Sequence, residues 1–133
     1  MSKYDTCHND VAEALRRDGW HVENEARRRY KKRLVNFDLR ASRADRTMFI
    51  EVKCFPMRGL PDEQYVAIGQ YLTYRTFLRL SQIAVPLYLA VPSTIYKIRF
   101  DAVMREILQE YRIKLLLFDV TGGRSLEWIE WSN

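Results

Sequence analysis

The chain of 133 residues lacks any long apolar run and has only two cysteines. The best apolar stretch, Ile83 to Pro92, is interrupted by Pro86, whereas a membrane-spanning helix needs ~20 apolar residues. The first residues show no apolar segment of the kind that begins a secretory signal. Cys7 and Cys54 are too few for a disulfide framework or a metal knuckle. We therefore expect a cytoplasmic protein with no membrane segment, whose cysteines are reduced and buried as small apolar residues.

The composition also excludes a disordered chain. Hydrophobic residues make up 47% of the sequence and aromatic residues 13%, which is enough to build a packed core. There are no internal repeats, no low-complexity segments and no linker. The length suits one domain of ordinary size. We expect residues 1–133 to form a single domain.

The formal net charge of +5 comes from one short stretch of the chain. This basic run interleaves Tyr30 with six cations, namely Arg27, Arg28, Arg29, Lys31, Lys32 and Arg33. Outside the basic run, cations and acids nearly cancel. Such a patch predicts contact with nucleic-acid phosphates. The alternative is a solvated hairpin or loop edge, where cations prevent unwanted strand pairing.

Hydrophobic periodicity and turn residues predict the order αβββαβ(α)αββ. The expected segments are a helix over 5–18, a strand over 20–24, strands over 34–40 and 48–55, a helix from 61 to about 83, a strand over 86–91, a short helix opened by 92–93, a helix over 101–111, a strand over 113–120, a turn over 121–124 and an edge strand over 125–131. The two strands after the basic run are expected to form a hairpin. This order predicts an α/β fold in which helices cover a mixed β-sheet.

Polar side chains converge on one face of the predicted hairpin. Glu51 and Lys53 are two residues apart and therefore share a face of their strand. If the numbers of opposed residues sum to about 87–89, Asp38 lies opposite or diagonal to Glu51. Asp38, Glu51 and the Val52 carbonyl are then expected to hold Mg²⁺ or Mn²⁺ through oxygen ligands. Lys53 would orient a water or neutralise charge on a phosphate. The alternative is an ordinary salt bridge, with Lys53 between the two carboxylates.

The first two helices add further candidates to this site. Gln70 and Tyr74, at positions i and i+4 of one helix, share a face and can hydrogen-bond a metal-bound water or a phosphate. The alternative is that the aromatic residues of this helix simply pack against the sheet. On the first helix, His8 lies beside the apolar stripe. It either borders the site or is an ordinary histidine at the edge of the core.

These motifs resemble the PD-(D/E)XK nuclease superfamily. Asp38, the segment Glu51–Lys53 and the Gln70-x-x-x-Tyr74 pair occur in the order of its hairpin and following helix. Phe37 stands where the proline of the motif name would be. The resemblance implies a restriction-endonuclease-like fold and metal-dependent cleavage of DNA, with Asp38, Glu51, Lys53, Gln70 and Tyr74 as catalytic residues.

A second resemblance covers almost the whole chain and points to the XisH family, the fdxN element excision controlling factors of cyanobacteria. It rests on collinear motifs at His8–Val11, Ala14–Leu15, Asp18–Trp20, Ile50–Lys53, Ile68–Tyr71, Tyr74–Arg75, Leu87–Pro92, Leu117–Asp119 and Glu127–Ile129. It implies a role in controlling the recombinase-driven excision of a DNA element during heterocyst development. The companion protein of that family is XisI.

Two functions therefore remain open from the sequence. One is a DNA-associated factor that cleaves phosphodiesters with Mg²⁺. The other is a catalytically silent accessory module that binds an XisI-like protein, the recombinase or DNA. A homodimer is expected only by analogy with nucleases that cut both strands.

Overall fold

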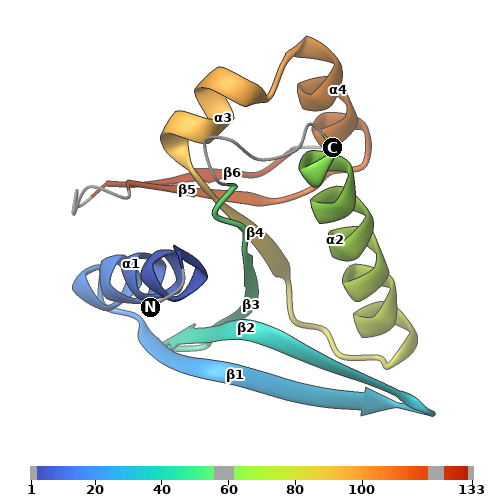
Figure 1. The fold of residues 1–133 in the computed structure, drawn as a ribbon. Coiled ribbons are helices and arrows are strands. Elements are labelled where there is room, and N and C mark those ends of the chain that lie inside the picture. The colour runs from blue at the N-terminus through green and yellow to red at the C-terminus, as the bar shows by residue number, and fades with distance from the viewer. Residues whose placement is uncertain (1–2, 56–61, 120–124, 132–133) are drawn as a thin grey trace.

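The structure is a computed structural model that describes residues 3–55, 62–119 and 125–131 (Figure 1). These segments contain α1 (Lys3–Arg17), β1 (His21–Tyr30), β2 (Arg33–Arg43), β3 (Arg46–Val52), α2 (Glu63–Leu80), β4 (Leu87–Pro92), α3 (Ser93–Arg99), α4 (Ala102–Glu110), β5 (Leu115–Phe118) and β6 (Leu126–Ile129). The order of helices and strands is the predicted one. The predicted turn over 121–124 lies outside the described residues.

All six strands belong to one sheet, in which spatial order follows chain order from β1 to β6. β1, β2 and β3 pair antiparallel, β3, β4 and β5 pair parallel, and β6 returns antiparallel to β5. The predicted mixed sheet flanked by helices is therefore confirmed. So are the hairpin of β2 and β3 and the position of the last strand at an edge.

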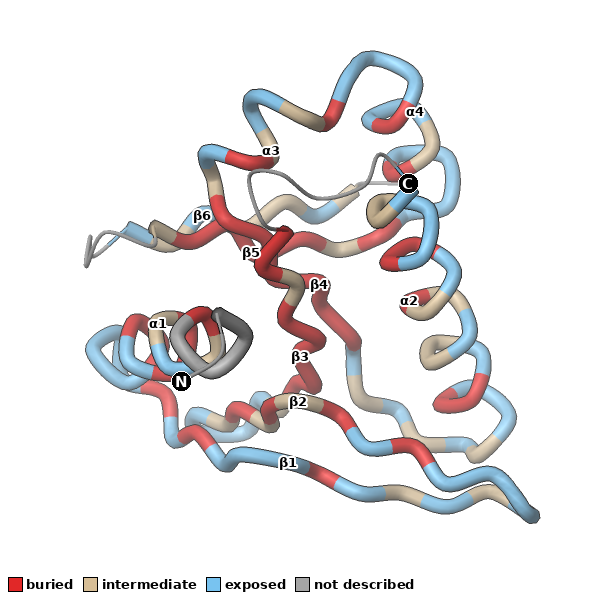
Figure 2. Tube along the Cα trace, in the orientation of Figure 1, coloured by how far each residue is buried: buried red, intermediate tan, exposed pale blue. Residues whose placement is uncertain are grey.

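Helices cover both faces of the sheet and create two hydrophobic cores. One core lies between α1 and the face that carries Ile50 and Ala90. The other lies between α2, α3 and α4 and the face that carries Phe49 and Leu89. Burial is concentrated in β3, β4 and β5, whereas most of the β1–β2 hairpin is exposed (Figure 2). Because β4 is covered on both faces, it is a continuous apolar run rather than an alternating one. No helix in the described part of the chain is both long and apolar enough to cross a membrane.

The β1–β2 hairpin changes its inward face half-way along its length. Leu39 packs in the core under α1, yet Phe37, two residues earlier, packs in the core under α2. Residues two apart share a face of a regular strand, so the strand must twist sharply between them. At the same level of β1, Glu25 adopts a left-handed backbone with φ of 60°. The outer half of the hairpin consequently curves away beneath α2 (Figure 1).

Several boundaries of the predicted elements require correction: for example, β2 extends to Arg43 rather than Arg40, and β3 ends at Val52 rather than Phe55. The first strand does not end at Asn24 but runs to Tyr30, so the basic run occupies the end of β1, the turn and the start of β2. The long helix ends at Leu80 rather than near Ile83. Gln82, with φ of 58°, turns the chain out of the helix, and the Ile83 N–H then bonds the Leu78 carbonyl at 3.0 Å.

The expectation of two reduced cysteines is wrong in this structure, although both residues are buried as predicted. Cys7 on α1 and Cys54, just beyond β3, are joined as a disulfide. The packing of α1 on the face of β3 brings their Cα atoms to 5.8 Å, within the range that a disulfide spans. Their separation of 47 residues gave no indication of this pairing.

Leu89→Ala is expected to lower the free energy of unfolding by about 2–5 kcal/mol, because it leaves a cavity in a fully buried strand. The matched control is Val103→Ala, which truncates an exposed side chain on α4 and should change stability by less than about 0.5 kcal/mol. Urea unfolding of both variants measures the difference. Equal losses would contradict the position of β4 at the centre of the sheet.

Candidate active site

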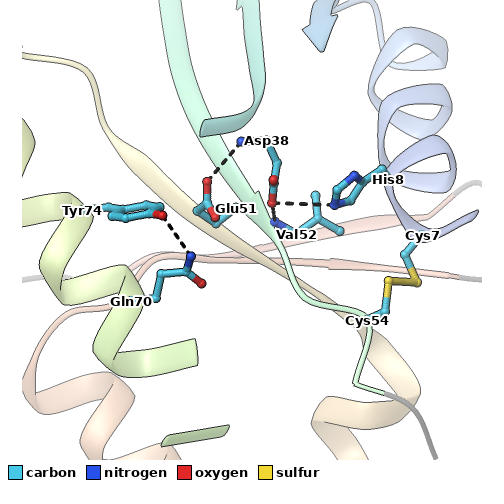
Figure 3. Close-up of polar contacts among 8 residues, drawn as sticks. All are labelled: Cys7, His8, Asp38, Glu51, Val52, Cys54, Gln70 and Tyr74. Carbon is cyan, nitrogen blue, oxygen red and sulfur yellow. Dashed lines mark hydrogen bonds and ion pairs between the residues drawn. A yellow bond between two sulfur atoms is a disulfide. The ribbon is translucent and has the colours of Figure 1, made fainter. Parts of the chain in front are cut away.

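Asp38 and Glu51 lie opposite one another where β2 separates from β3. Leu39 and Ile50 form the last pair of that ladder, and the next opposed residues along it are Asp38 and Glu51. The Asp38 N–H donates to Glu51 Oε1 at 3.1 Å, and the Val52 N–H donates to Asp38 Oδ2 at 2.8 Å (Figure 3). We call this pair of side-chain-to-backbone bonds the carboxylate clasp. The structure thus brings the two predicted carboxylates together, within the predicted range of registers.

The carboxylate clasp satisfies backbone groups that the separating strands leave without a ladder partner. A buried N–H without an acceptor costs free energy comparable to a lost hydrogen bond. Because β2 curves away with β1 at this level, the two carboxylates replace backbone carbonyls as acceptors for these N–H groups. Both acidic side chains are consequently fixed at the end of the strand pair.

The environment of Glu51 opposes its ionisation. Its side chain faces the α2 core and is only 3% exposed, whereas that of Asp38 is 26% exposed. Burial, and then the nearby Asp38 carboxylate, raise the pKa of Glu51 to about 8. The hydrogen bond from the Asp38 N–H and the charge of Lys53 act in the opposite direction. Without a further cation, the site therefore holds a proton on Glu51 at neutral pH.

Lys53 is positioned by the parallel ladder but has no fixed partner for its ammonium. Its N–H bonds the Ala90 carbonyl at 2.9 Å, and its side chain is half-buried. Within the described segments, that ammonium makes no hydrogen bond or ion pair. The predicted alternative, an ordinary salt bridge in which Lys53 joins the two carboxylates, is not formed. The ammonium is free to interact with a bound anion.

α2 presents Gln70 and Tyr74 toward Glu51 (Figure 3). The Gln70 amide donates to Tyr74 Oη at 3.0 Å, and the Tyr74 ring packs edge-on against Phe37 at 5.6 Å. Tyr74 is therefore both a packing residue and a polar partner of Gln70, so the two interpretations of this residue from the sequence apply together. Gln70 Oε1 is buried and has no hydrogen-bond partner among the described residues. Buried acceptors of this kind are usually paired with a donor, and none of the described residues provides one here.

α1 borders the site through His8. Its Nε2 lies 3.7 Å from Asp38 Oδ2, close enough for an ion pair when the imidazole is protonated. Both side chains line a cavity of about 370 Å³, whose remaining walls are formed by Asn9, Asn24, Glu25 and Asn36. Reasoning from the sequence missed these polar neighbours. Their proximity depends on the docking of α1 against the β1–β2 hairpin, which sequence spacing does not reveal.

The basic run extends along the outer half of the β1–β2 hairpin. Arg27, Arg28 and Arg29 lie on β1, Lys31 and Lys32 form the turn, and Arg33 begins β2. The last three of these cations, together with the C-terminal half of α2, line a cavity of about 640 Å³. The hairpin that carries the basic run is the one from which Asp38 projects.

Comparisons with known proteins identify the family. The XisH protein family model matches residues 1–124. The chain belongs to the XisH family. It is 33% identical to an XisH family protein from Nostoc punctiforme PCC 73102, with a TM-score of 0.85 over 95% of this chain and 100% of that one. It is 32% identical to an fdxN element excision controlling factor protein from Anabaena variabilis, with a TM-score of 0.86 over 95% of this chain and 99% of that one. Among curated proteins, no match is found.

The donor set of this XisH-family site fits a hard divalent cation. Two carboxylates crowd one position, and the orphaned Gln70 oxygen provides an acceptor for a metal-bound water. Mg²⁺ commonly binds one or two carboxylates and keeps several waters. In the described part of the chain, no group of three or more His, Cys, Asp or Glu side chains lies close enough together to hold a metal ion. For Val52, the structure establishes its N–H as a donor to Asp38, and its carbonyl stays a predicted ligand.

Glu51→Gln is expected to flatten the pH dependence of stability in EDTA. Because the folded-state pKa lies near 8, above the usual value of 4.5, the folded protein binds this proton more tightly than the unfolded chain does. Wild-type stability should therefore fall as the pH rises between these two values, by at most roughly 1.4 kcal/mol per pH unit. The substituted amide keeps an acceptor for the Asp38 N–H and does not titrate.

Urea unfolding at several values between pH 5 and about 9 measures this effect. The matched control is Glu106→Gln, which changes an exposed glutamate on α4. It should keep the wild-type slope. A slope that is unchanged in Glu51→Gln would contradict a buried, protonated Glu51.

Proposed function

We propose that this XisH-family protein controls the excision of a DNA element by site-specific recombination and carries a metal-dependent nuclease site for DNA phosphodiesters. We further propose that its sheet is a restriction-endonuclease-like core of the PD-(D/E)XK type. The observation that supports this most strongly is the carboxylate clasp, which holds two acids together beside Lys53 and Gln70. Among the described residues, the Lys53 ammonium and Gln70 Oε1 have no hydrogen-bond partner.

Each residue of the site has a role that its position supports. Asp38 and Glu51 would hold Mg²⁺ or Mn²⁺, with the Val52 carbonyl as a further ligand. When bound, the cation polarises a phosphodiester and promotes ionisation of a water. The ammonium of Lys53, which has no partner among the described residues, neutralises charge that develops on the phosphate. Gln70 Oε1 accepts a hydrogen bond from the attacking water, and Tyr74 fixes the orientation of the Gln70 amide.

The proposed role in excision rests on the family and on the charge of the hairpin. The Anabaena relative is named an fdxN element excision controlling factor. The basic run offers phosphate contacts on the same hairpin that carries Asp38. DNA is the proposed substrate, and an XisI-like protein and a site-specific recombinase are the proposed protein partners.

One observation favours the second candidate, a catalytically silent module. Each carboxylate already accepts a hydrogen bond from a backbone N–H, so the strand junction is held together without an ion. A site of this kind can persist as a scaffold that binds DNA or protein partners without cleaving a phosphodiester. Metal binding and cleavage separate the two candidates.

Lys53→Ala is expected to reduce DNA cleavage at least 100-fold, a typical loss when a charge-stabilising group is removed, without unfolding the protein. The assay incubates supercoiled, single-stranded and branched DNA with Mg²⁺ or Mn²⁺. Lys97→Ala, which removes an exposed lysine on α3, is the matched control and should cleave like wild type. Equal activity of the Lys53 and Lys97 variants would exclude the catalytic assignment.

Calorimetry with Mn²⁺ is expected to detect one binding site in the wild type and binding at least roughly 10-fold weaker in Asp38→Asn. Loss of a carboxylate ligand should cost no less than loss of an outer-shell partner, which typically weakens metal binding about 10–100-fold. Asp45→Asn, which changes an exposed acid in the β2–β3 turn, controls for the change in net charge and should bind like wild type. The absence of binding at millimolar ion would support the silent module instead.

A further inference from the structure

The basic run does not form a single surface, because strand alternation divides it between the two faces of the β1–β2 hairpin. Arg33 shares a face of β2 with Val35, which packs in the core under α2. Tyr30, opposite Arg33 in the ladder, is on the same face. Arg27 and Arg29 alternate with Tyr30's face of β1, so they lie on the opposite side of the hairpin and are exposed. Only part of the basic run therefore faces α2.

The face of the hairpin that is turned toward α2 forms a groove with this helix. Figure 1 shows the tip of β1 and β2 extending below the C-terminal end of α2. The ring of Tyr30 meets Phe77 of α2 edge-on, with ring centres 6.4 Å apart. The groove is the cavity of about 640 Å³ described above, and its helical wall consists of Leu72, Thr73, Thr76, Phe77 and Leu80. We call this cavity the hairpin groove.

The hairpin groove contains apolar side chains that the described part of the protein leaves uncovered. Leu80 is 49% exposed, and Leu72 and Tyr30 are half-buried. Exposed apolar surface in a concave site is typical of a site that binds an apolar group. A phosphodiester backbone carries charge but brings no such group. The groove is therefore better suited to a ligand with apolar side chains than to a nucleic-acid backbone.

The same groove is positively charged. Lys31 and Lys32 form the turn at its end, and Arg33 begins β2 beside them. The Lys31 ammonium lies 5.4 Å from the centre of the Tyr30 ring. In the segments that the structure describes, the side chains of Lys32 and Arg33 make no hydrogen bond or ion pair. None of the described residues that line the groove is acidic. Its electrostatic complement is a ligand with negative charge.

We propose that the hairpin groove binds a segment of a partner protein that combines acidic residues with large apolar side chains. The apolar side chains pack on Leu80, and the carboxylates meet Lys32 and Arg33. The inference deepens the proposed function, on which it rests, by assigning a surface to its protein partner. The proposed contacts with DNA phosphates then fall to Arg27 and Arg29, on the other face of the hairpin.

The test measures binding of a labelled amphipathic peptide by fluorescence anisotropy in EDTA. This acidic peptide has Leu at helical positions i, i+3, i+4 and i+7 and Glu at the positions between them. A second peptide replaces each Leu by Ser, and a third replaces each Glu by Lys. The wild type should bind the acidic peptide at least roughly 10-fold more tightly than either of the others. Similar binding of all three peptides, or no binding of the acidic one, would overturn the proposal.

Two double variants test the charge of the groove at equal net charge. Lys32→Gln/Arg33→Gln removes two cations from the groove, whereas Arg27→Gln/Arg29→Gln removes two from the opposite face. Thermal unfolding confirms that both variants are folded. The groove variant is expected to bind the acidic peptide roughly 5-fold more weakly than the control variant at about 50 mM salt, and the difference should shrink as the salt concentration rises. Equal binding by the two variants would count against the groove and overturn the proposal.

Leu80→Asn tests the apolar wall of the groove. Leu80 is half exposed at the last position of α2, so its replacement should not unfold the protein. The matched control is Ile98→Asn, which changes a side chain on α3 that is 69% exposed. Leu80→Asn should weaken binding of the acidic peptide roughly 5–10-fold at every salt concentration, because apolar contact area is lost. Unchanged binding in Leu80→Asn would also overturn the proposal.

Duplex DNA is the second probe in the same assay. DNA binding that is weakened more by Lys32→Gln/Arg33→Gln than by Arg27→Gln/Arg29→Gln would assign the groove to DNA and overturn the proposal. The result is also separable from the nuclease site. Cleavage that depends on Lys53, in a protein that does not bind the acidic peptide, would overturn the inference and support the nuclease site. Peptide binding with the expected losses, in a protein that does not cleave DNA, would do the reverse.

Discussion

The carboxylate clasp between β2 and β3 is the interaction on which the candidate site depends. Where the strands separate, backbone N–H groups lose their ladder partners, and Asp38 and Glu51 provide the missing acceptors. The need for these acceptors places two acids at one position. β3 ends there, at Val52, and Lys53 is the next residue. The same strand end is joined to α1 through Cys54 and Cys7. A change at the clasp should therefore alter the geometry of the site before it alters the rest of the sheet.

The clasp also creates an electrostatic cost that a bound cation would relieve. Burial and the neighbouring Asp38 raise the pKa of Glu51, so ionisation of both acids requires additional positive charge nearby. Lys53 supplies part of it, since its charge lowers that pKa. The unsatisfied oxygen of Gln70 adds a second demand, for a hydrogen-bond donor. A hydrated divalent cation would meet both demands, because it brings charge and water molecules together.

Local patterns predicted most of the fold and the centre of the site. Alternation along β2 and β3 predicted the face of each strand, and the assumed register, with opposed numbers summing to about 87–89, placed Asp38 against Glu51. The i, i+4 spacing likewise placed Gln70 beside Tyr74. The same patterns could not show that the face of Glu51 is also buried, because burial depends on α2 packing over it. They also could not show that Cys7 meets Cys54, since this contact depends on how α1 docks.

The charge of the chain shows why the arrangement of residues in space matters more than their totals. By sequence, the positive charge lies in the basic run, and the remainder of the chain is nearly neutral. In the fold, however, the packing of α2 against the α4–β5 turn places Arg75, Arg79 and Arg112 along one cavity, and none of its described lining residues is acidic. The acids that balance the total lie elsewhere, and two of them form the clasp. Since Coulomb interactions between exposed charges weaken beyond a Debye length of about 8–10 Å, a phosphate responds to its local surroundings rather than to the net charge of +5. A nearly neutral stretch of sequence can thus contribute a cationic surface, and only the packing of α2 against its neighbours reveals it.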